Sequence, residues 1–182
     1  RHNVIELRLD DEACGQIQRV WEKLERAGIT SVMPDAGGRA HVSLVVGTDA
    51  DTDELIRAVR TVCVSRAALQ LHFPYLGLFR GPSHVGFLGV AHEPGLSALQ
   101  KAVYRAAAPH LRTVHEHYRP EVCVFHCTLG LEIPDQRLLE YFQIVKDARL
   151  PTAAAVAAID VVEYFPAQTL ATIRIPYETH GA

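Results

Sequence analysis

Hydrophobic and polar positions alternate in several short segments of the chain, which is the pattern of strands with one buried face. Strands are therefore expected at residues 4–9, 41–46, 69–73, 85–90, 121–131, 159–162 and 170–175. Gly77, Gly81 and Pro82 lie between the third and the fourth of these segments. Because glycine and proline favour turns, those two strands are expected to form an antiparallel hairpin.

Four other segments place apolar residues at helical spacing instead. Helices are therefore expected around residues 17–24, 55–62, 96–103 and 138–145. Asp51 with Glu54 resembles a capping box at the start of the second helix, and Pro109 should end the third. The polar segments 34–38 and 112–120 are expected to be loops.

One pattern occurs twice along the chain. His41-Val42-Ser43-Leu44 and His126-Cys127-Thr128-Leu129 each lie in an expected strand that is followed by a polar turn and a helix. The two motifs are separated by nearly half of the 182 residues. This spacing suggests two similar lobes rather than two independent domains, so we expect a single domain over residues 1–182.

The two motifs carry the residue types that acid–base catalysis at a phosphate needs. A strand has a side-chain period of two, so His41 shares a face with Ser43, and His126 shares a face with Thr128. Imidazole titrates near neutrality, so one histidine could take a proton from the attacking group while the other protonates the leaving oxygen. The hydroxyls could stabilise charge on the non-bridging oxygens without a metal. A single strand histidine is more often structural, but two matching copies favour catalysis.

Composition and charge exclude several other classes of protein. The net charge of −3 argues against a protein that coats nucleic acid, since that function needs a basic surface. Residues 1–7 do not resemble a signal peptide, and no run of 18 apolar residues predicts a membrane span. The four cysteines form no C-x-x-C pair, so reduced thiols and a cytoplasmic protein are expected.

At its two motifs the chain resembles the two-histidine (2H) phosphoesterase superfamily, in the branch of bacterial 2'-5' RNA ligase-like and 2',3'-cyclic phosphodiesterase proteins. That family is defined by two H-x-[ST]-x motifs, one in each lobe. Segments 76–79 and 87–90, followed by residues 96–100, look like the hairpin and helix that lie between the motifs in the family. The resemblance therefore covers nearly the whole chain.

The resemblance implies an α+β fold with two pseudo-symmetric lobes, each with an antiparallel sheet and helices, and an active site in the cleft between them. It also implies a metal-independent phosphodiesterase that needs no cofactor. Its substrate would be a 2',3'-cyclic phosphate or a 2'-5' phosphodiester of a nucleotide or RNA end, with ligation as the reverse reaction. His41, Ser43, His126 and Thr128 take the family's catalytic positions by direct match. We expect a monomer.

The two motifs are nearly symmetric, so the roles of the two histidines could be exchanged. We assign His41 as the general acid and His126 as the general base in hydrolysis, with the reverse assignment left open. In the ligating direction the two roles must exchange.

Four further residues are candidate substrate contacts. Tyr118 and Arg119 precede the second motif and could line the cleft, with Arg119 holding phosphate. Tyr164 and Phe165 lie near the last hairpin and could stack on a base. The alternatives are an exposed loop for the first pair and aromatic packing under the hairpin for the second.

Two other functions fit parts of the sequence. A non-catalytic protein that binds a nucleotide or RNA end could use the same cleft, although binding alone does not need two titratable groups. A zinc-dependent hydrolase could use His115, His117, Cys123, His126 and Cys127. The cysteines, however, fall on the apolar face of the expected strand, where cysteines are usually core residues.

Overall fold

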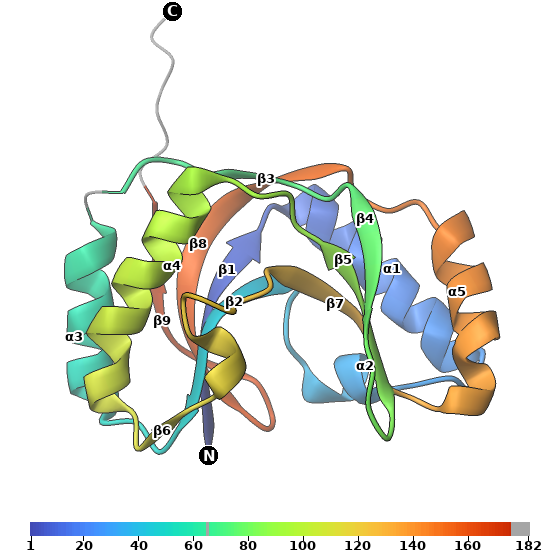
Figure 1. Cartoon of the computed structure of the whole chain (residues 1–182), viewed down its shortest axis with the longest axis horizontal. Coiled ribbons are helices and arrows are strands. Elements are labelled where there is room, and N and C mark those ends of the chain that lie inside the picture. Colours follow the sequence, from blue (N-terminus) through green and yellow to red (C-terminus); the bar gives the residue numbers. More distant parts are fainter. Residues whose placement is uncertain (65, 176–182) are drawn as a thin grey trace, which may run out of the picture.

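The computed structural model describes residues 1–64 and 66–175, so Ser65 and residues 176–182 of the expected domain lie outside the described residues. In the described part, two antiparallel sheets lie side by side, and helices cover the outer side of each (Figure 1). This arrangement confirms the predicted α+β class with two lobes.

The larger sheet contains the first motif. Its strands are β1 (His2–Leu9), β2 (His41–Thr48), β3 (Gln70–His72), β6 (Thr113–Val114), β8 (Ala153–Tyr164) and β9 (Gln168–Ile173). They lie in the order β3-β8-β1-β2-β6, and β9 also pairs with β8. β1 is therefore an inner strand, with β8 on one side and the first motif strand, β2, on the other.

The smaller sheet contains the second motif. Its strands are β4 (Tyr75–Phe79), β5 (His84–Gly89) and β7 (His126–Ile133), in the order β4-β5-β7. We call β2 and β7 the motif strands, because each begins at the histidine of its motif. The two motif strands belong to different sheets. This is the arrangement expected if each lobe carries one motif.

Three of the five α-helices among the described residues begin at a side-chain cap. The bounds of the five are α1 (Asp11–Arg26), α2 (Val32–Ala36), α3 (Thr52–Cys63), α4 (Pro94–Ala107) and α5 (Leu138–Asp147), with single 3-10 turns at η1 (Ala108–His110), η2 (Glu116–Tyr118) and η3 (Asp135–Arg137). The capped helices are α1, α3 and α4. The Asp10 carboxylate accepts from the backbone N–H of Ala13, and the Asp51 carboxylate accepts from that of Glu54. No helix among the described residues combines the length and the apolar character that a membrane span needs.

Two helices pack against the sheet that they do not come from. α1 follows β1 of the larger sheet but contacts β7 and α5, whereas α4 follows β5 of the smaller sheet but contacts β2 and α3 (Figure 1). The Trp21 indole N–H of α1 donates to the Thr128 carbonyl at 3.1 Å, and the Gln100 amide of α4 donates to the Leu44 carbonyl at 3.1 Å. We call α1 and α4 the crossing helices. Each binds the backbone of a motif strand from behind.

The alternation of each motif strand places its apolar residues in the core, as predicted. Val42 and Leu44 of β2 are fully buried, and so are Cys127 and Leu129 of β7. All four belong to one hydrophobic cluster that extends through both halves of the molecule. The opposite face of each strand, with the histidine and the hydroxyl, is consequently turned toward the space between the sheets.

The predicted hairpin was wrong in one strand. Residues 69–73 do not pair with β5; the short strand β3 pairs with β8 instead, and β4 is the partner of β5. Gly77 of β4 lies against the Phe87 ring, where an added Cβ would come within 2.2 Å of the ring. The glycine that suggested a turn is thus a strand residue that makes room for an aromatic side chain.

Several boundaries also differ from the prediction, and β8 extends well beyond the expected strand 159–162. Residues 121–125 do not extend the second motif strand, because the N–H groups of Val122 and Cys123 both donate to the Arg119 carbonyl at 3.0 Å and form a turn. The expected loop 34–38 is helical up to Ala36, where α2 ends. The expected loop 112–120 contains β6 and η2.

Replacing Gln100 with methionine should destabilise the protein by about 2 kcal/mol, because two backbone carbonyls lose their donor while side-chain volume is nearly kept. The Gln100 side chain is 1% exposed and donates to the carbonyls of Leu44 and Tyr118. Equilibrium urea unfolding measures the change. Gln18→Met on the exposed face of α1 is the matched control and should change stability by less than about 0.5 kcal/mol. Equal effects of the two substitutions would contradict the role of Gln100.

Candidate active site

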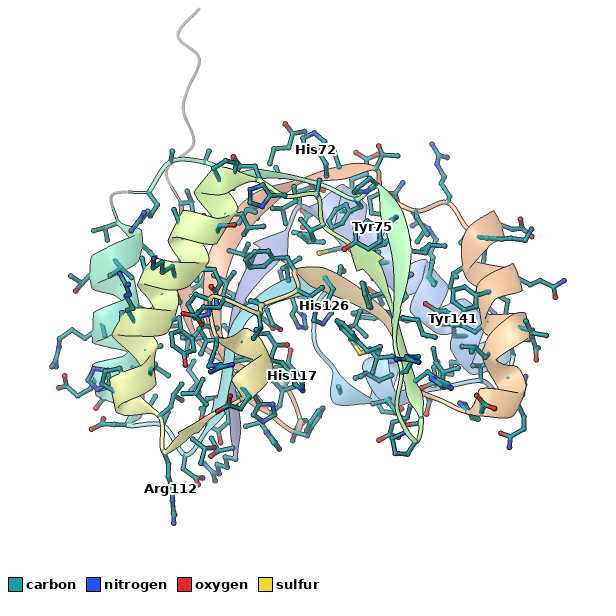
Figure 2. All side chains as sticks on the ribbon, in the orientation of Figure 1. His72, Tyr75, Arg112, His117, His126 and Tyr141 are labelled. Carbon is teal, nitrogen blue, oxygen red and sulfur yellow. The ribbon has the colours of Figure 1, made fainter. Side chains whose placement is uncertain are left out.

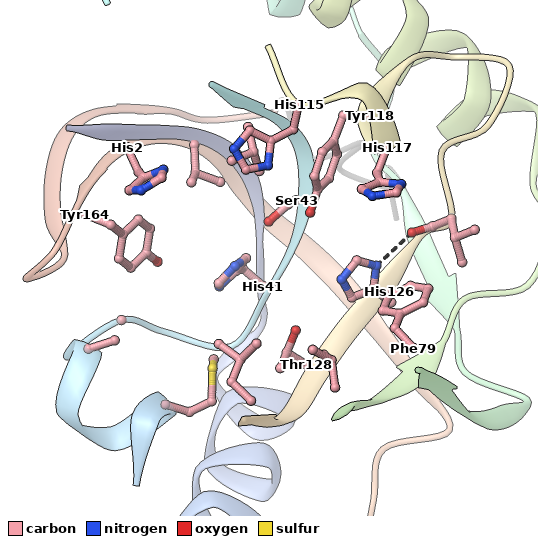
Figure 3. A pocket seen from close by; sticks show the side chains of 18 of the residues that line it. His2, His41, Ser43, Phe79, His115, His117, Tyr118, His126, Thr128 and Tyr164 are labelled. Carbon is pink, nitrogen blue, oxygen red and sulfur yellow. Dashed lines mark hydrogen bonds between the residues drawn. The ribbon is translucent and has the colours of Figure 1, made fainter. Parts of the chain in front are cut away.

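The four motif side chains line one cavity between the two sheets. His41 and Ser43 enter it from β2, and His126 and Thr128 enter it from β7 (Figure 3). The cavity has a volume of about 1010 Å³, which is enough for a nucleotide-sized ligand. We call this cavity the cleft. Figure 2 shows where the cleft lies: His126 is between the two halves of the molecule, whereas Arg112 projects from the periphery of the molecule.

Each motif histidine is oriented by a backbone carbonyl two residues earlier in the chain. His41 Nδ1 lies 2.7 Å from the Arg39 carbonyl oxygen, and His126 Nδ1 lies 2.7 Å from the Val124 carbonyl oxygen. A carbonyl oxygen can only accept, so Nδ1 carries a hydrogen in both rings. Nε2 is therefore the atom of each imidazole that can exchange a proton with a ligand.

His126 lies against aromatic rings. Its ring centroid is 4.9 Å from that of Phe79 and 5.3 Å from that of Phe87. Burial among these groups lowers the pKa of His126, the hydrogen bond to Val124 acts in the opposite direction, and the charge of His41 lowers the pKa further. A lowered pKa keeps the imidazole neutral near pH 7, which is the form that accepts a proton.

His41 lies beside a carboxylate that the sequence analysis did not select. Its Nε2 is 3.1 Å from Glu6 Oε2, and the Tyr164 hydroxyl donates to the same oxygen at 3.3 Å. Glu6 is only 3% exposed. The signal in the sequence was an acidic residue in strand 4–9, on the face that also carries Arg8.

Tyr118 lies beside Ser43 at the side of the cleft (Figure 3). Burial raises the pKa of Tyr118 to about 12, and the charge of Cys123 adds to this, whereas the interaction of its hydroxyl with Ser43 acts in the opposite direction. The Tyr118 carbonyl accepts from Gln100 at 2.8 Å, so the crossing helix α4 also holds this residue in place. The tyrosine hydroxyl therefore stays protonated and can orient the Ser43 hydroxyl.

The remaining predicted contacts divide between the cleft and the surface. Tyr164 and Phe165 both line the cleft, and Phe165 is 64% exposed at its rim. Arg119 was predicted as a candidate phosphate contact in the cleft, but it is not among the residues that line the cleft. It lines a separate surface hollow, and its Nε lies 3.3 Å from Glu116 Oε2. The turn at residues 119–123 directs its side chain away.

Several residues of the cleft were not predicted as substrate contacts. His2, His115, His117 and Phe79 line it, and the His2 ring lies edge-on to His115 at a centroid distance of 6.1 Å. His115 and His117 stood out in the sequence only as a zinc motif. Their location depends on how η2 folds over β2, and no local pattern indicates that.

The proposed zinc ligands do not form a metal site. Cys127 is buried in the core, and His126 lies on the opposite face of β7. Among the described residues, no group of three or more His, Cys, Asp and Glu side chains is arranged to hold a metal ion. Cys127 thus occupies the core position that the strand alternation predicted, whereas Cys123 lies in the turn before β7 and is only partly buried.

The fold and the paired motifs are those of the two-histidine phosphoesterase superfamily. The model of the 2'-5' RNA ligase superfamily matches residues 9–165, and the chain belongs to that family. No curated protein sequence shows a significant match to the chain.

Solved structures show the same fold at low sequence identity. Escherichia coli LigT complexed with 3'-AMP is similar with a TM-score of 0.62 and 17% identity, over 97% of this chain and 99% of that one. TT0787 of Thermus thermophilus is similar with a TM-score of 0.62 and 13% identity, over 98% of this chain and 100% of that one. The arrangement of sheets and helices is therefore shared along nearly the whole length.

Replacing Phe79 with alanine should raise the pH at which His126 titrates toward the ordinary value of about 6.5, because water would reach a ring that is now covered. NMR titration of the histidine Cε1–H signals, with His126 assigned by substitution, measures this shift. Tyr75→Ala is the matched control, since Tyr75 is an exposed aromatic of the same strand that contacts Phe87 but not His126. A His126 titration that responds equally to both changes would contradict the covering role of Phe79.

Proposed function

We propose that the protein is a metal-independent phosphodiesterase that acts on a 2',3'-cyclic phosphate or a 2'-5' phosphodiester of a nucleotide or RNA end. The observation that carries this proposal is the pairing within the cleft. Two imidazoles enter one cavity from opposite sheets, each beside a hydroxyl and each with Nδ1 fixed by a backbone carbonyl.

Hydrolysis requires two proton transfers at one phosphorus atom. In the proposed mechanism, His126 Nε2 takes a proton from the water that attacks phosphorus, and His41 Nε2 gives a proton to the leaving ribose oxygen as the P–O bond breaks. Ser43 and Thr128 donate hydrogen bonds to the non-bridging oxygens, where negative charge increases in the transition state. Ligation would use the 5'-hydroxyl of a second RNA end in place of water as the nucleophile on the cyclic phosphate. In the reverse of that step the ribose hydroxyl attacks phosphorus and the 5'-oxygen leaves, so the roles of the histidines exchange.

The charges around the cleft favour a small substrate. Among the described residues that line it, Arg80 is the one permanently charged side chain, and five histidines and a larger set of apolar and aromatic residues make up much of the rest. A long RNA strand would need a basic track for its backbone. We therefore propose a nucleoside 2',3'-cyclic phosphate, a 2'-5' dinucleotide or a short RNA end as the substrate.

The ligands bound by a structural relative are of the same class as the proposed substrate, since they are nucleotides. E. coli LigT, which shares this fold, has been solved in complex with 3'-AMP and with NADP+. Both ligands are nucleotides with a phosphate group on a ribose. An apolar rim that includes Phe165, Val122 and Val124, all exposed at the cleft, would suit the base of such a ligand.

Replacing His41 or His126 with alanine should each reduce kcat by roughly 10²- to 10⁴-fold, because each substitution removes one proton transfer. Initial rates on 2',3'-cyclic nucleotides, 2'-5' dinucleotides and cyclic-phosphate-ended RNA measure this, with identification of the products. The control is His92→Ala, an exposed histidine that does not line the cleft, and it should retain full activity.

Two outcomes would contradict the proposal. Near-normal turnover by either cleft variant would exclude the two-histidine mechanism. Binding of a nucleotide by the wild-type protein without turnover of any substrate would instead identify a non-catalytic nucleotide or RNA-end binding protein.

Activity should survive prolonged treatment with EDTA, because imidazoles and hydroxyls supply every step of the proposed mechanism. Rates before and after chelation, with the metal content of the protein measured in parallel, provide the test. Loss of activity that zinc restores would favour a zinc-dependent hydrolase instead.

A further inference from the structure

A buried carboxylate beside one of the two histidines has no part in the two motifs. Glu6 lies on β1 directly across from Ser43 of β2, immediately after a register shift between Ile5 and Glu6. Its neighbours along the strand, Ile5 and Leu7, point into the core on the opposite face. Burying a carboxylate is costly unless a partner compensates it, so its partners indicate what it does.

Among the described residues, the one ion-pair partner of Glu6 is the Nε2 end of His41, which is cationic when the ring is protonated. Glu6 Oε2 is 3.1 Å from His41 Nε2, while His41 Nδ1 is occupied by the Arg39 carbonyl at 2.7 Å. If the ring were neutral, Nδ1 would keep its hydrogen and an electron-rich Nε2 would lie beside a carboxylate oxygen, which is unfavourable. A protonated ring places positive charge at the same distance, so the contact favours a proton on Nε2.

The contact leaves the proton on Nε2 available to a ligand. It has the length of an ion pair without the alignment of a hydrogen bond, and Glu6 accepts a hydrogen bond from the Tyr164 hydroxyl instead. Glu6 is 3% exposed, whereas His41 lines the cleft. The carboxylate can therefore stabilise the imidazolium from behind while substrate approaches from the open side.

Other charged groups around Glu6 are themselves paired. Asp160 of β8 lies opposite Glu6 on the other side of β1, and Arg8 binds both its oxygens, at 2.7 and 2.9 Å. Burial raises the pKa of Glu6, and the charge of Asp160 acts in the same direction, whereas His41, Tyr164 and Arg8 lower it. His41 is therefore the charge partner that faces Glu6 from the cleft.

The second motif has no equivalent of Glu6. Among the described residues, no carboxylate lies within ion-pair distance of His126, and the rings of Phe79 and Phe87 lie against it instead. An uncharged environment disfavours the imidazolium form. The two motifs are thus alike in sequence but opposite in their surroundings.

We propose that Glu6 is a positioning residue that holds His41 in its protonated form and thereby makes His41 the general acid and His126 the general base of hydrolysis. The proposal rests on the proposed phosphodiesterase function for its catalytic consequence, but the protonation of His41 does not depend on turnover. Tyr164 assists by holding the Glu6 carboxylate in place.

The first test follows the histidines directly by NMR. In the wild-type protein, the His41 ring should lose its proton at a higher pH than the His126 ring. In Glu6→Gln, which keeps the shape of the side chain, the titration of His41 should move down by about one pH unit or more. Glu163→Gln is the control, because Glu163 lies on β8, pairs with Arg1 and does not line the cleft.

The second test uses the pH dependence of kcat/KM. Loss of the carboxylate should move the basic limb of the profile to lower pH by about one unit, because that limb reports the acid, and should leave the acidic limb nearly unchanged. At pH values on the falling, basic side of the profile, this shift corresponds to about a tenfold loss of kcat/KM. A general structural defect would lower the profile without moving it.

The outcomes separate this proposal from the proposed function. If the acidic limb of the pH profile moves in Glu6→Gln, His41 is the base and the proposal is overturned. An NMR titration of His41 that Glu6→Gln leaves unchanged would also overturn it. A shifted titration in a protein that turns over no substrate would support the pairing and refute the phosphodiesterase function. If Glu6→Gln does not fold, as judged by circular dichroism, the order of the two wild-type titrations decides alone, and His126 titrating at the higher pH overturns the proposal.

Discussion

The geometry of the cleft depends on the burial of one face of each motif strand. Val42 and Leu44, like Cys127 and Leu129, are fully buried, so the faces that carry the histidines must turn away from the core. Burial alone would not fix where the strands lie relative to each other. The crossing helices add that constraint, because each donates a side-chain hydrogen bond to a carbonyl within a motif of the other half of the molecule. Displacement of either helix would therefore move a histidine.

Two nearly identical motifs thus place the same side chain in two different environments. Both rings donate from Nδ1 to a carbonyl two residues earlier, so the local geometry is the same in each. The difference comes from residues outside the motifs, namely Glu6 beside His41 and Phe79 with Phe87 around His126. An enzyme that moves two protons at one phosphate needs such a difference, since one imidazole must begin protonated and the other neutral.

The sequence predicted what depends on local periodicity. The motif strands, their buried faces and most helices follow from spacing within about ten residues, and the two matching motifs identified the pair of histidines. The prediction failed where a residue's role depends on a distant partner. Gly77 was interpreted as a turn because the Phe87 ring that it accommodates lies on another strand. Arg119 was a candidate for the cleft, with an exposed loop as the alternative, because the turn that follows it was not recognised. Glu6 was missed because its importance comes from the pairing of β1 with β2.

The exchange of helices between the two sheets has a consequence for how such a chain could be divided. A fragment with β1, α1 and β2 alone would have a helix whose packing partner, β7, is absent, and a motif strand whose covering helix, α4, is absent. Two copies of one half could satisfy both needs only by swapping helices around a twofold axis, with one histidine from each copy at the shared centre. A single chain that holds both motif strands is free of that twofold symmetry. Once the halves are joined, each can change independently, and only then can one histidine acquire a carboxylate that the other lacks.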